Sequence, residues 1–189
     1  MKQKNEKPHS QLVEQLQIEL RSEVLSIVRV LGDKSLTVGF AESCTGGLLS
    51  SYFTELAGVS SVFVGSIISY DNKVKQKFLM VSEEVLKTRG AVSFEVAKQM
   101  AEGAVTALGT KLAVSITGIA GPSGGSSTKP VGTVFIAVAG LESETKSETQ
   151  SFEHHFDIDG NGNDVRKIIQ LQSCIAAVKH LNEFVNNKT

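Results

Sequence analysis

A serine, a cysteine and a threonine stand together between a short apolar segment and an amphipathic one. Ser43, Cys44 and Thr45 follow residues 35–38, which favour a buried strand, and precede apolar residues at helical spacing. The start of a helix offers unpaired backbone N–H groups and about half a positive charge from the helix dipole. This position suits a bound anion, or an alkoxide nucleophile and the oxyanion that it generates. The competing interpretation is that Ser43 or Thr45 only caps the helix.

A serine nucleophile requires a base, and a lysine is a better candidate here than a histidine. The four histidines lie near the amino terminus, on an edge strand or on the last helix: His9, His154, His155 and His180. His154 and His155 are adjacent on a strand and point to opposite faces, so no metal site is predicted. Lys75 lies five residues after Tyr70, close enough to share a pocket, although a solvated lysine is the alternative. Burial lowers a lysine pKa from about 10.4 towards neutrality, and a tyrosine hydroxyl can pass a proton from serine to lysine.

Residues 117–130 form a glycine-rich loop between two further strand-like segments. Backbone N–H groups of such a loop can cradle a phosphate, with Ser126, Ser127, Thr128 or Lys129 adding side-chain donors. The alternative is a plain surface crossover, but a length above about 12 residues favours function. The loop contains neither a Walker A pattern nor a dinucleotide fingerprint.

Strands and helices must bring these polar turns to one edge of a sheet. Helical periodicity covers residues 13–31, 48–57, 93–108 and 165–185, and strand-like segments cover 61–70, 111–116, 131–139 and 151–157. Gly32 is expected to end the first helix, and residues 142–150 to form a polar turn. The order favours a three-layer α/β/α sandwich with a mixed, mostly parallel sheet of about five strands. Ligands of such sheets lie beyond the carboxyl ends of the strands, where all three polar turns are placed.

The composition is that of an ordinary globular protein. The 189 residues suffice for one domain, expected over residues 10–187 after a disordered tail of residues 1–9. Because 19 basic residues nearly balance 20 acidic ones, for a net charge of −1, no overall field favours nucleic acid. No apolar run reaches the roughly 20 residues of a membrane span, and the first residues do not form a secretory signal. The two cysteines belong to no metal-ligand pattern. The sequence therefore predicts a cytoplasmic protein without nucleic-acid or membrane partners.

Four motifs, in order and spacing, resemble those of the CinA carboxy-terminal domain family. They are Ala41-Glu42-Ser43-Cys44-Thr45-Gly46-Gly47, Tyr70-x-Asn72-x-x-Lys75, Gly90-Ala91-Val92-Ser93, and Gly118-Ile119-Ala120-Gly121-Pro122-x-Gly124-Gly125-Ser126 with Lys129-Pro130-Val131-Gly132-Thr133. The resemblance covers about residues 10–185. It implies a stand-alone nicotinamide-nucleotide amidase, which hydrolyses nicotinamide mononucleotide to nicotinate mononucleotide and ammonia.

The same resemblance implies that Ser43 is the nucleophile and that Tyr70 and Lys75 activate it. It implies that the nucleotide lies against Cys44, Thr45, Gly46, Asn72, Thr117, Gly118, Gly121, Gly124, Gly125 and Ser126. Such an enzyme requires no metal or organic cofactor, its partner is the pyridine nucleotide substrate, and a homodimer or higher homo-oligomer is expected. Cys44, more reactive than serine as a thiolate, is a rival nucleophile.

One departure from the family affects the expected activity. Where the family usually carries Gly-Asp-Arg, this chain has Gly160, Asn161 and Gly162. The missing arginine removes a possible charged partner for a phosphate or carboxylate. A nucleotide-binding module of the same fold, with weak or no catalysis, is therefore the alternative to the amidase.

Overall fold

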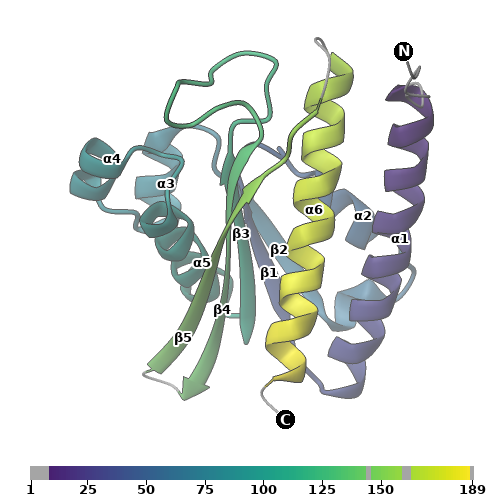
Figure 1. Ribbon diagram of the computed structural model, residues 1–189. Helices are drawn as coiled ribbons and strands as arrows, with labels where there is room; N and C mark the ends of the chain where they lie inside the picture. Colours follow the sequence, from purple (N-terminus) through teal and green to yellow (C-terminus); the bar gives the residue numbers. More distant parts are fainter. Residues whose placement is uncertain (1–8, 144–145, 159–162, 188–189) are drawn as a thin grey trace.

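The structure, a computed structural model, describes residues 9–143, 146–158 and 163–187. A five-stranded sheet lies between helices on both faces, which confirms the predicted sandwich (Figure 1). The strands are β1 (Val38–Glu42), β2 (Phe63–Ile68), β3 (Leu112–Gly118), β4 (Thr133–Ser143) and β5 (Lys146–His155). The helices are α1 (His9–Asp33), α2 (Leu48–Thr54), α3 (Asn72–Leu79), α4 (Glu83–Arg89), α5 (Phe94–Leu108) and α6 (Asn163–Asn186), with a 3-10 turn, η1 (Val59–Ser61). His9, expected in the tail, begins α1; the rest of that tail and Gly160–Gly162 lie outside the described residues.

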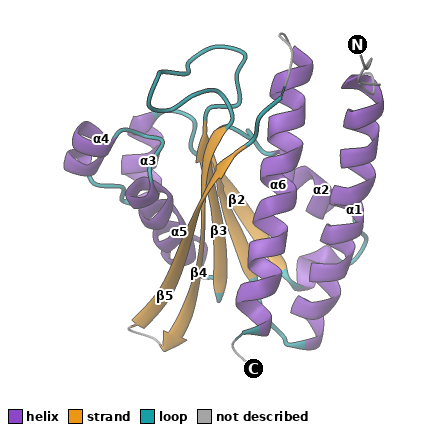
Figure 2. Cartoon of the chain, in the orientation of Figure 1, coloured by secondary structure: helices purple, strands orange, loops and turns teal. Residues whose placement is uncertain are grey.

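The strand order is β2-β1-β3-β4-β5. β1 pairs in parallel with both β2 and β3, whereas β4 is antiparallel to β3 and β5 is antiparallel to β4. Four of the five strands therefore run in one direction, as expected for a mixed, mostly parallel sheet. The carboxyl ends of β1, β2 and β3 meet at one edge, and the long loop that follows β3 stands above this edge in Figure 2.

The two faces of the sheet carry side chains of different size. The face towards α5 has Ala41, Ala113, Ala137 and Ala139, with Phe135 as the large exception. The opposite face, towards α6 and α2, has larger residues, Phe40, Val114, Ile136 and Val138. Small side chains let α5 lie close to the sheet, where the Ser115 hydroxyl donates to the carbonyl of Ala97 in α5. The site-bearing edge of the sheet is thus held between two packed cores.

Strand β1 lies further along the chain than predicted. The sequence placed the strand at residues 35–38, whereas β1 begins at Val38. All five residues from Val38 to Glu42 are buried, so the strand has no alternation that would mark its limits. Gly39, which was expected in the turn, lies inside the strand. Its position requires a glycine, because a Cβ there would be 2.5 Å from Cδ1 of Leu108 in α5.

Two other boundaries differ from the predicted ones. Helix α1 continues through Gly32 to Asp33, and the chain then turns at Ser35, which has a left-handed φ of 52°. β4 and β5 extend as a hairpin into the segment predicted as a polar turn, with pairs such as Ala139 and Thr149. Backbone pairing between antiparallel strands does not depend on side-chain polarity, so the polar composition was misleading.

Candidate active site

The hydroxyl of Ser43 and the amine of Lys75 meet in a buried contact at the carboxyl edge of the sheet. Nζ of Lys75 lies 3.0 Å from Oγ of Ser43. Ser43 directly follows β1, and Lys75 lies on α3. The Asp71 side chain caps α3 by accepting a hydrogen bond from the Lys73 backbone N–H, which fixes where the helix begins. The proximity that the predicted serine–lysine pair requires is present in the structure.

The environment of Lys75 makes its neutral form more accessible than it is for a lysine in water. The residue is only 1% exposed, which is rare for a lysine. Nζ also contacts the carbonyl oxygens of Ser69 and, at 3.2 Å, Tyr70, in the turn between β2 and α3. Burial lowers the pKa of Lys75 from 10.5 to about 8, against smaller opposing effects of Cys44 and Asp71. At such a pKa about a tenth of the amine is neutral at pH 7, so Lys75 can act as a base.

Glu42 occupies the helix start that the sequence predicted to be free for an anion. It is the last residue of β1, is fully buried, and turns its carboxylate onto the first turn of α2. The carboxylate accepts hydrogen bonds from the backbone N–H groups of Gly47 (3.0 Å), Leu49 (3.2 Å) and Ser50 (2.9 Å), and from the Ser50 hydroxyl.

The cap of α2 therefore comes from Glu42, and the alternative prediction, a Ser43 or Thr45 cap, is wrong. Gly47 stands at the cap position in a left-handed conformation without a side-chain cap of its own. Because Glu42 satisfies the first N–H groups of α2, these groups are not available to a ligand. An acidic residue just before a helix start was the signal for this role.

A cavity of about 250 Å³ opens beside Ser43 and Lys75. Of the residues predicted for the site, it is lined by Ser43, Cys44, Tyr70, Lys75, Thr117, Gly118, Gly121 and Gly124. Ala91, Val92 and Arg166 complete its walls together with other residues of the glycine loop. The cavity thus joins the turn after β1, the turn after β2, the turn between α4 and α5, and the loop after β3.

The remaining predicted site residues, Thr45, Gly46, Asn72, Gly125 and Ser126, are not among those that line this cavity. Thr45 is 3% exposed, and its hydroxyl has no partner within the described residues. Asn72 is the first residue of α3. The Ser126 hydroxyl accepts a hydrogen bond from the backbone N–H of Lys129 at 3.0 Å, inside its own loop. Only the first half of the glycine loop therefore faces the cavity.

The hydroxyl of Tyr70 lies towards Arg166 and not towards the serine–lysine pair. Its oxygen is 3.5 Å from Nη2 of Arg166, and the side chain is 65% exposed. Within the described residues, the Tyr70 group that contacts Lys75 is the backbone carbonyl. A proton relay through the Tyr70 hydroxyl stays a prediction, and it requires the side chain to turn.

Two polar residues of α6 tie the turns around the cavity together. Nη1 of Arg166 donates to the carbonyl of Gly121 at 2.7 Å, and Nε2 of Gln170 donates to the carbonyl of Cys44 at 2.8 Å. Four positions apart, the two side chains lie on the same side of the helix. The sequence indicated an apolar stripe on this helix but did not indicate Gln170. The available signal was the spacing of Arg166 and Gln170, each of which directly follows a buried residue of the apolar stripe.

The cysteine next to the serine is a poor nucleophile in this environment. Cys44 is 5% exposed, and burial raises the pKa of its thiol to about 12. The thiolate, which is the reactive form, is therefore scarce near neutral pH. Among the described residues, no group of three or more histidine, cysteine or acidic side chains is arranged to hold a metal. Nor does any helix of the described segments have the length and apolarity of a membrane span.

Comparison with known proteins relates the chain to one family. The family model of the CinA C-terminal domain matches residues 21–185. A CinA-like protein of Leptospira interrogans is 49% identical over 128 residues, which are 68% of this chain and 30% of that protein. A CinA-like protein of Thermotoga maritima is 40% identical over 163 residues, covering 86% of this chain and 37% of that protein. The chain thus spans about a third of the length of these relatives.

Solved structures have the same fold. A competence/damage inducible protein from Agrobacterium tumefaciens superposes with a TM-score of 0.80 at 36% identity, covering 89% of this chain and 96% of that one. A CinA superfamily protein from Escherichia coli has a TM-score of 0.75 at 27% identity, covering 87% of this chain and 90% of that one.

Proposed function

We propose that this chain, which belongs to the CinA C-terminal domain family, is an amidase that deamidates nicotinamide mononucleotide with Ser43 as its nucleophile. The products are nicotinate mononucleotide and ammonia. The observation that carries the proposal is the 3.0 Å contact between Nζ of the buried Lys75 and Oγ of Ser43. Both residues line the cavity, so the pair is within reach of a bound small molecule.

The contacts of Lys75 orient it as the base. A neutral amine has two N–H donors and one lone pair. In the neutral form the carbonyls of Ser69 and Tyr70 accept the two N–H groups, and the contact in which the charged amine donates to Ser43 reverses, with the lone pair accepting from the hydroxyl. The serine proton then passes to Nζ while Oγ attacks the carboxamide carbon.

The attack produces a tetrahedral oxyanion that needs N–H donors. Because Glu42 holds those of Gly47, Leu49 and Ser50, the candidates are the backbone N–H groups of Cys44 and Thr45, which follow Ser43 in the chain. The intermediate collapses when protonated Lys75 gives its proton to the leaving nitrogen, which departs as ammonia. Water, activated by the neutral amine, then hydrolyses the ester on Ser43 to release the carboxylate.

The phosphate of the nucleotide fits the side of the cavity that Arg166 and the glycine loop form. Arg166 lines this side, and its guanidinium has N–H donors beyond the one that holds Gly121. Backbone N–H groups of the glycine loop between Gly121 and Gly124 add further donors for an anion. The carboxamide then lies at Ser43.

An ammonia-release assay tests this function, with nicotinamide mononucleotide as substrate and nicotinamide and the dinucleotide as controls. We expect ammonia from the mononucleotide, and a loss of at least about a thousandfold in kcat for Ser43→Ala with an unchanged melting curve. Ser51→Ala, which removes an exposed hydroxyl on α2, is the matched control. Undiminished turnover by Ser43→Ala removes the serine from the mechanism. Mononucleotide binding by the wild type without ammonia would support the alternative, a binding module.

A further inference from the structure

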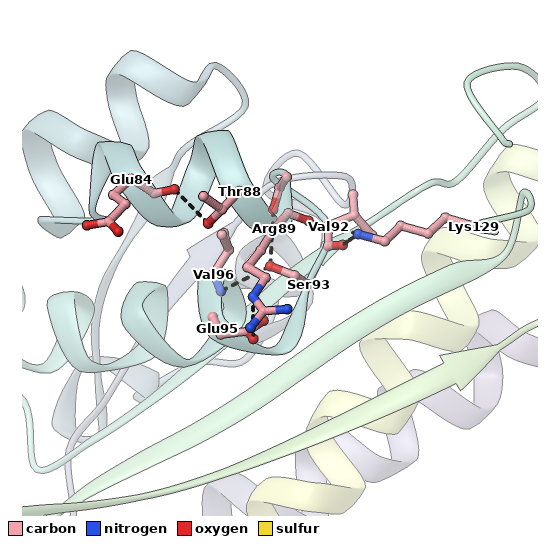
Figure 3. Close-up of polar contacts among 9 residues, drawn as sticks. Glu84, Thr88, Arg89, Val92, Ser93, Glu95, Val96 and Lys129 are labelled. Atoms are coloured by element: carbon pink, nitrogen blue, oxygen red, sulfur yellow. Dashed lines mark hydrogen bonds and ion pairs between the residues drawn. The ribbon is translucent and has the colours of Figure 1, made fainter.

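The turn of residues 89–93, between α4 and α5, presents its carbonyl oxygens to side chains. The Ser93 hydroxyl donates to Gly90 at 3.0 Å, and the hydroxyl of Thr117, at the end of β3, donates to Ala91 at 2.8 Å. The carbonyls of Arg89 and Val92 accept hydrogen bonds from Nζ of Lys129 at 3.0 and 2.6 Å. In Figure 3 the Lys129 side chain reaches across from the glycine loop to this turn. Four consecutive carbonyls are thus satisfied by side chains from three segments.

We propose that Lys129 is a positioning residue that fastens the end of the glycine loop to the 89–93 turn and thereby sets the width of the cavity beside Ser43. The effect on substrate rests on the amidase function proposed above. The effect on the loop does not depend on that function.

Burial distinguishes Lys129 from the loop residues that precede it. Residues 122–128 are all exposed, whereas Lys129 is half-buried. A compact turn aims its side chain, because the Ser126 hydroxyl accepts from the Lys129 N–H and the Ser126 N–H donates to the Lys129 carbonyl. At the other end, Arg166 holds the carbonyl of Gly121. A cation therefore fixes each end of the exposed segment.

The amine of Lys129 can hold two carbonyl oxygens of the turn at once. An ammonium has three donors, and Lys129 directs two of them to carbonyl oxygens of one turn. Hydrogen bonds from a charged donor are stronger than those between neutral groups. The sequence indicated Lys129 as a possible phosphate donor, but its amine is engaged by these carbonyls and it does not line the cavity.

The contact of Lys129 with the 89–93 turn joins two segments that carry walls of the cavity. Ala91 and Val92 form one wall, and the segment from Ile119 to Gly124 forms another. The bond from Lys129 to the carbonyl of Val92 ties the loop that carries the second wall to the first wall. When this bond is lost, the loop can move away from the turn while Ser43 and Lys75, which belong to other segments, keep their contact.

Lys129→Met tests the proposal because it keeps the length of the side chain and removes its donors. We expect backbone amides of residues 122–129 to exchange hydrogen about tenfold faster, and KM for the mononucleotide to rise about tenfold, with kcat changed less than about twofold. Lys129→Arg keeps the donors and is expected to restore both values. Lys111→Met, an exposed lysine at the opposite end of β3, is the matched control and is expected to change neither.

Unchanged amide exchange in Lys129→Met overturns the proposal, and so does a fall in kcat at constant KM, which indicates a role in the chemistry. If Lys129→Met does not fold, as judged by circular dichroism, Lys129→Gln, which keeps a neutral donor, is measured in its place. If the wild type releases no ammonia, the proposed function fails, but the exchange experiment still decides whether Lys129 holds the loop.

Discussion

At the scale of single residues, the environment of Lys75 determines what the site can do. Two carbonyls and a serine hydroxyl surround the buried amine, and burial lowers its pKa to about 8. The type and approximate place of this residue followed from the sequence. The orientations of the nearby Tyr70 hydroxyl and Glu42 carboxylate did not, because Arg166 of α6 contacts the first and the N–H groups of α2 hold the second. A linear pattern does not contain the rotamer of a side chain.

The lowered pKa predicts the pH dependence of the reaction. Only the neutral amine accepts the serine proton, so kcat/KM should rise about tenfold per pH unit below the pKa and level off above about pH 8. Ammonia release measured from pH 6 to 10 gives this profile. A rate that falls through pH 8 would mean that the active form of Lys75 is the ammonium.

The raised pKa of Cys44 predicts that its thiol is dispensable for nucleophilic attack. We expect Cys44→Ala to keep turnover within about tenfold of the wild type, because a thiol with a pKa of about 12 stays protonated. Iodoacetamide at neutral pH should leave the activity of the wild type unchanged. Loss of activity in both experiments would transfer the nucleophilic role to Cys44.

At the scale of elements, α3 places Lys75, and α5 places α3. Gly103 of α5 lies against the last turn of α3, where a Cβ would overlap the carbonyl oxygen of Leu79. The sequence predicted α5 from the cap and periodicity of residues 93–108, but it left residues 73–77 of α3 as a short helical or irregular piece. It did not predict this contact, because the apolar period reports which face of a helix is buried and not which element it meets.

Gly103→Ala should therefore push α3 away from α5. We expect a loss of about 1–3 kcal/mol in the free energy of unfolding, together with a lower kcat as Lys75 moves from Ser43. Urea denaturation and ammonia release measure the two effects. Gly32→Ala is the control, because Gly32 is also helical and nothing lies within 4 Å of its added Cβ. Equal stability of the two variants contradicts the close contact.

At the scale of the whole molecule, α1 supports the cavity although none of its described residues lines it. α1 packs along α6, as Figure 1 shows, and α6 carries the two side chains that hold Gly121 and Cys44. The sequence predicted the buried stripe of α1 correctly, since its apolar residues recur at the helical period. It did not identify α6 as the surface that α1 covers. The homo-oligomeric state and the cytoplasmic location expected from the sequence remain predictions.

Leu20 of α1 is fully buried, so Leu20→Ala should reduce the free energy of unfolding by about 2–5 kcal/mol. Because the residue does not line the cavity, KM should stay unchanged at temperatures where the variant is folded. Urea denaturation and steady-state kinetics at low temperature measure both. Ile18→Ala, on the exposed side of the same helix, should have little effect on either. A changed KM for Leu20→Ala at full folding would indicate that α1 also controls the shape of the site.

The carboxylate of Glu42 gives the cleft a direction. The Glu42 carboxylate lies behind the nucleophile, at the start of α2, while the guanidinium of Arg166 lines the cavity beside Gly121. When Lys75 is in its neutral, reactive form, an anionic group is repelled from the carboxylate and attracted to the guanidinium. This asymmetry favours one orientation in which the proposed mononucleotide enters the cavity. The uncharged amide enters first, and the phosphate follows. A molecule that carries its negative charge at the leading end, as the deamidated product does, is then favoured to leave.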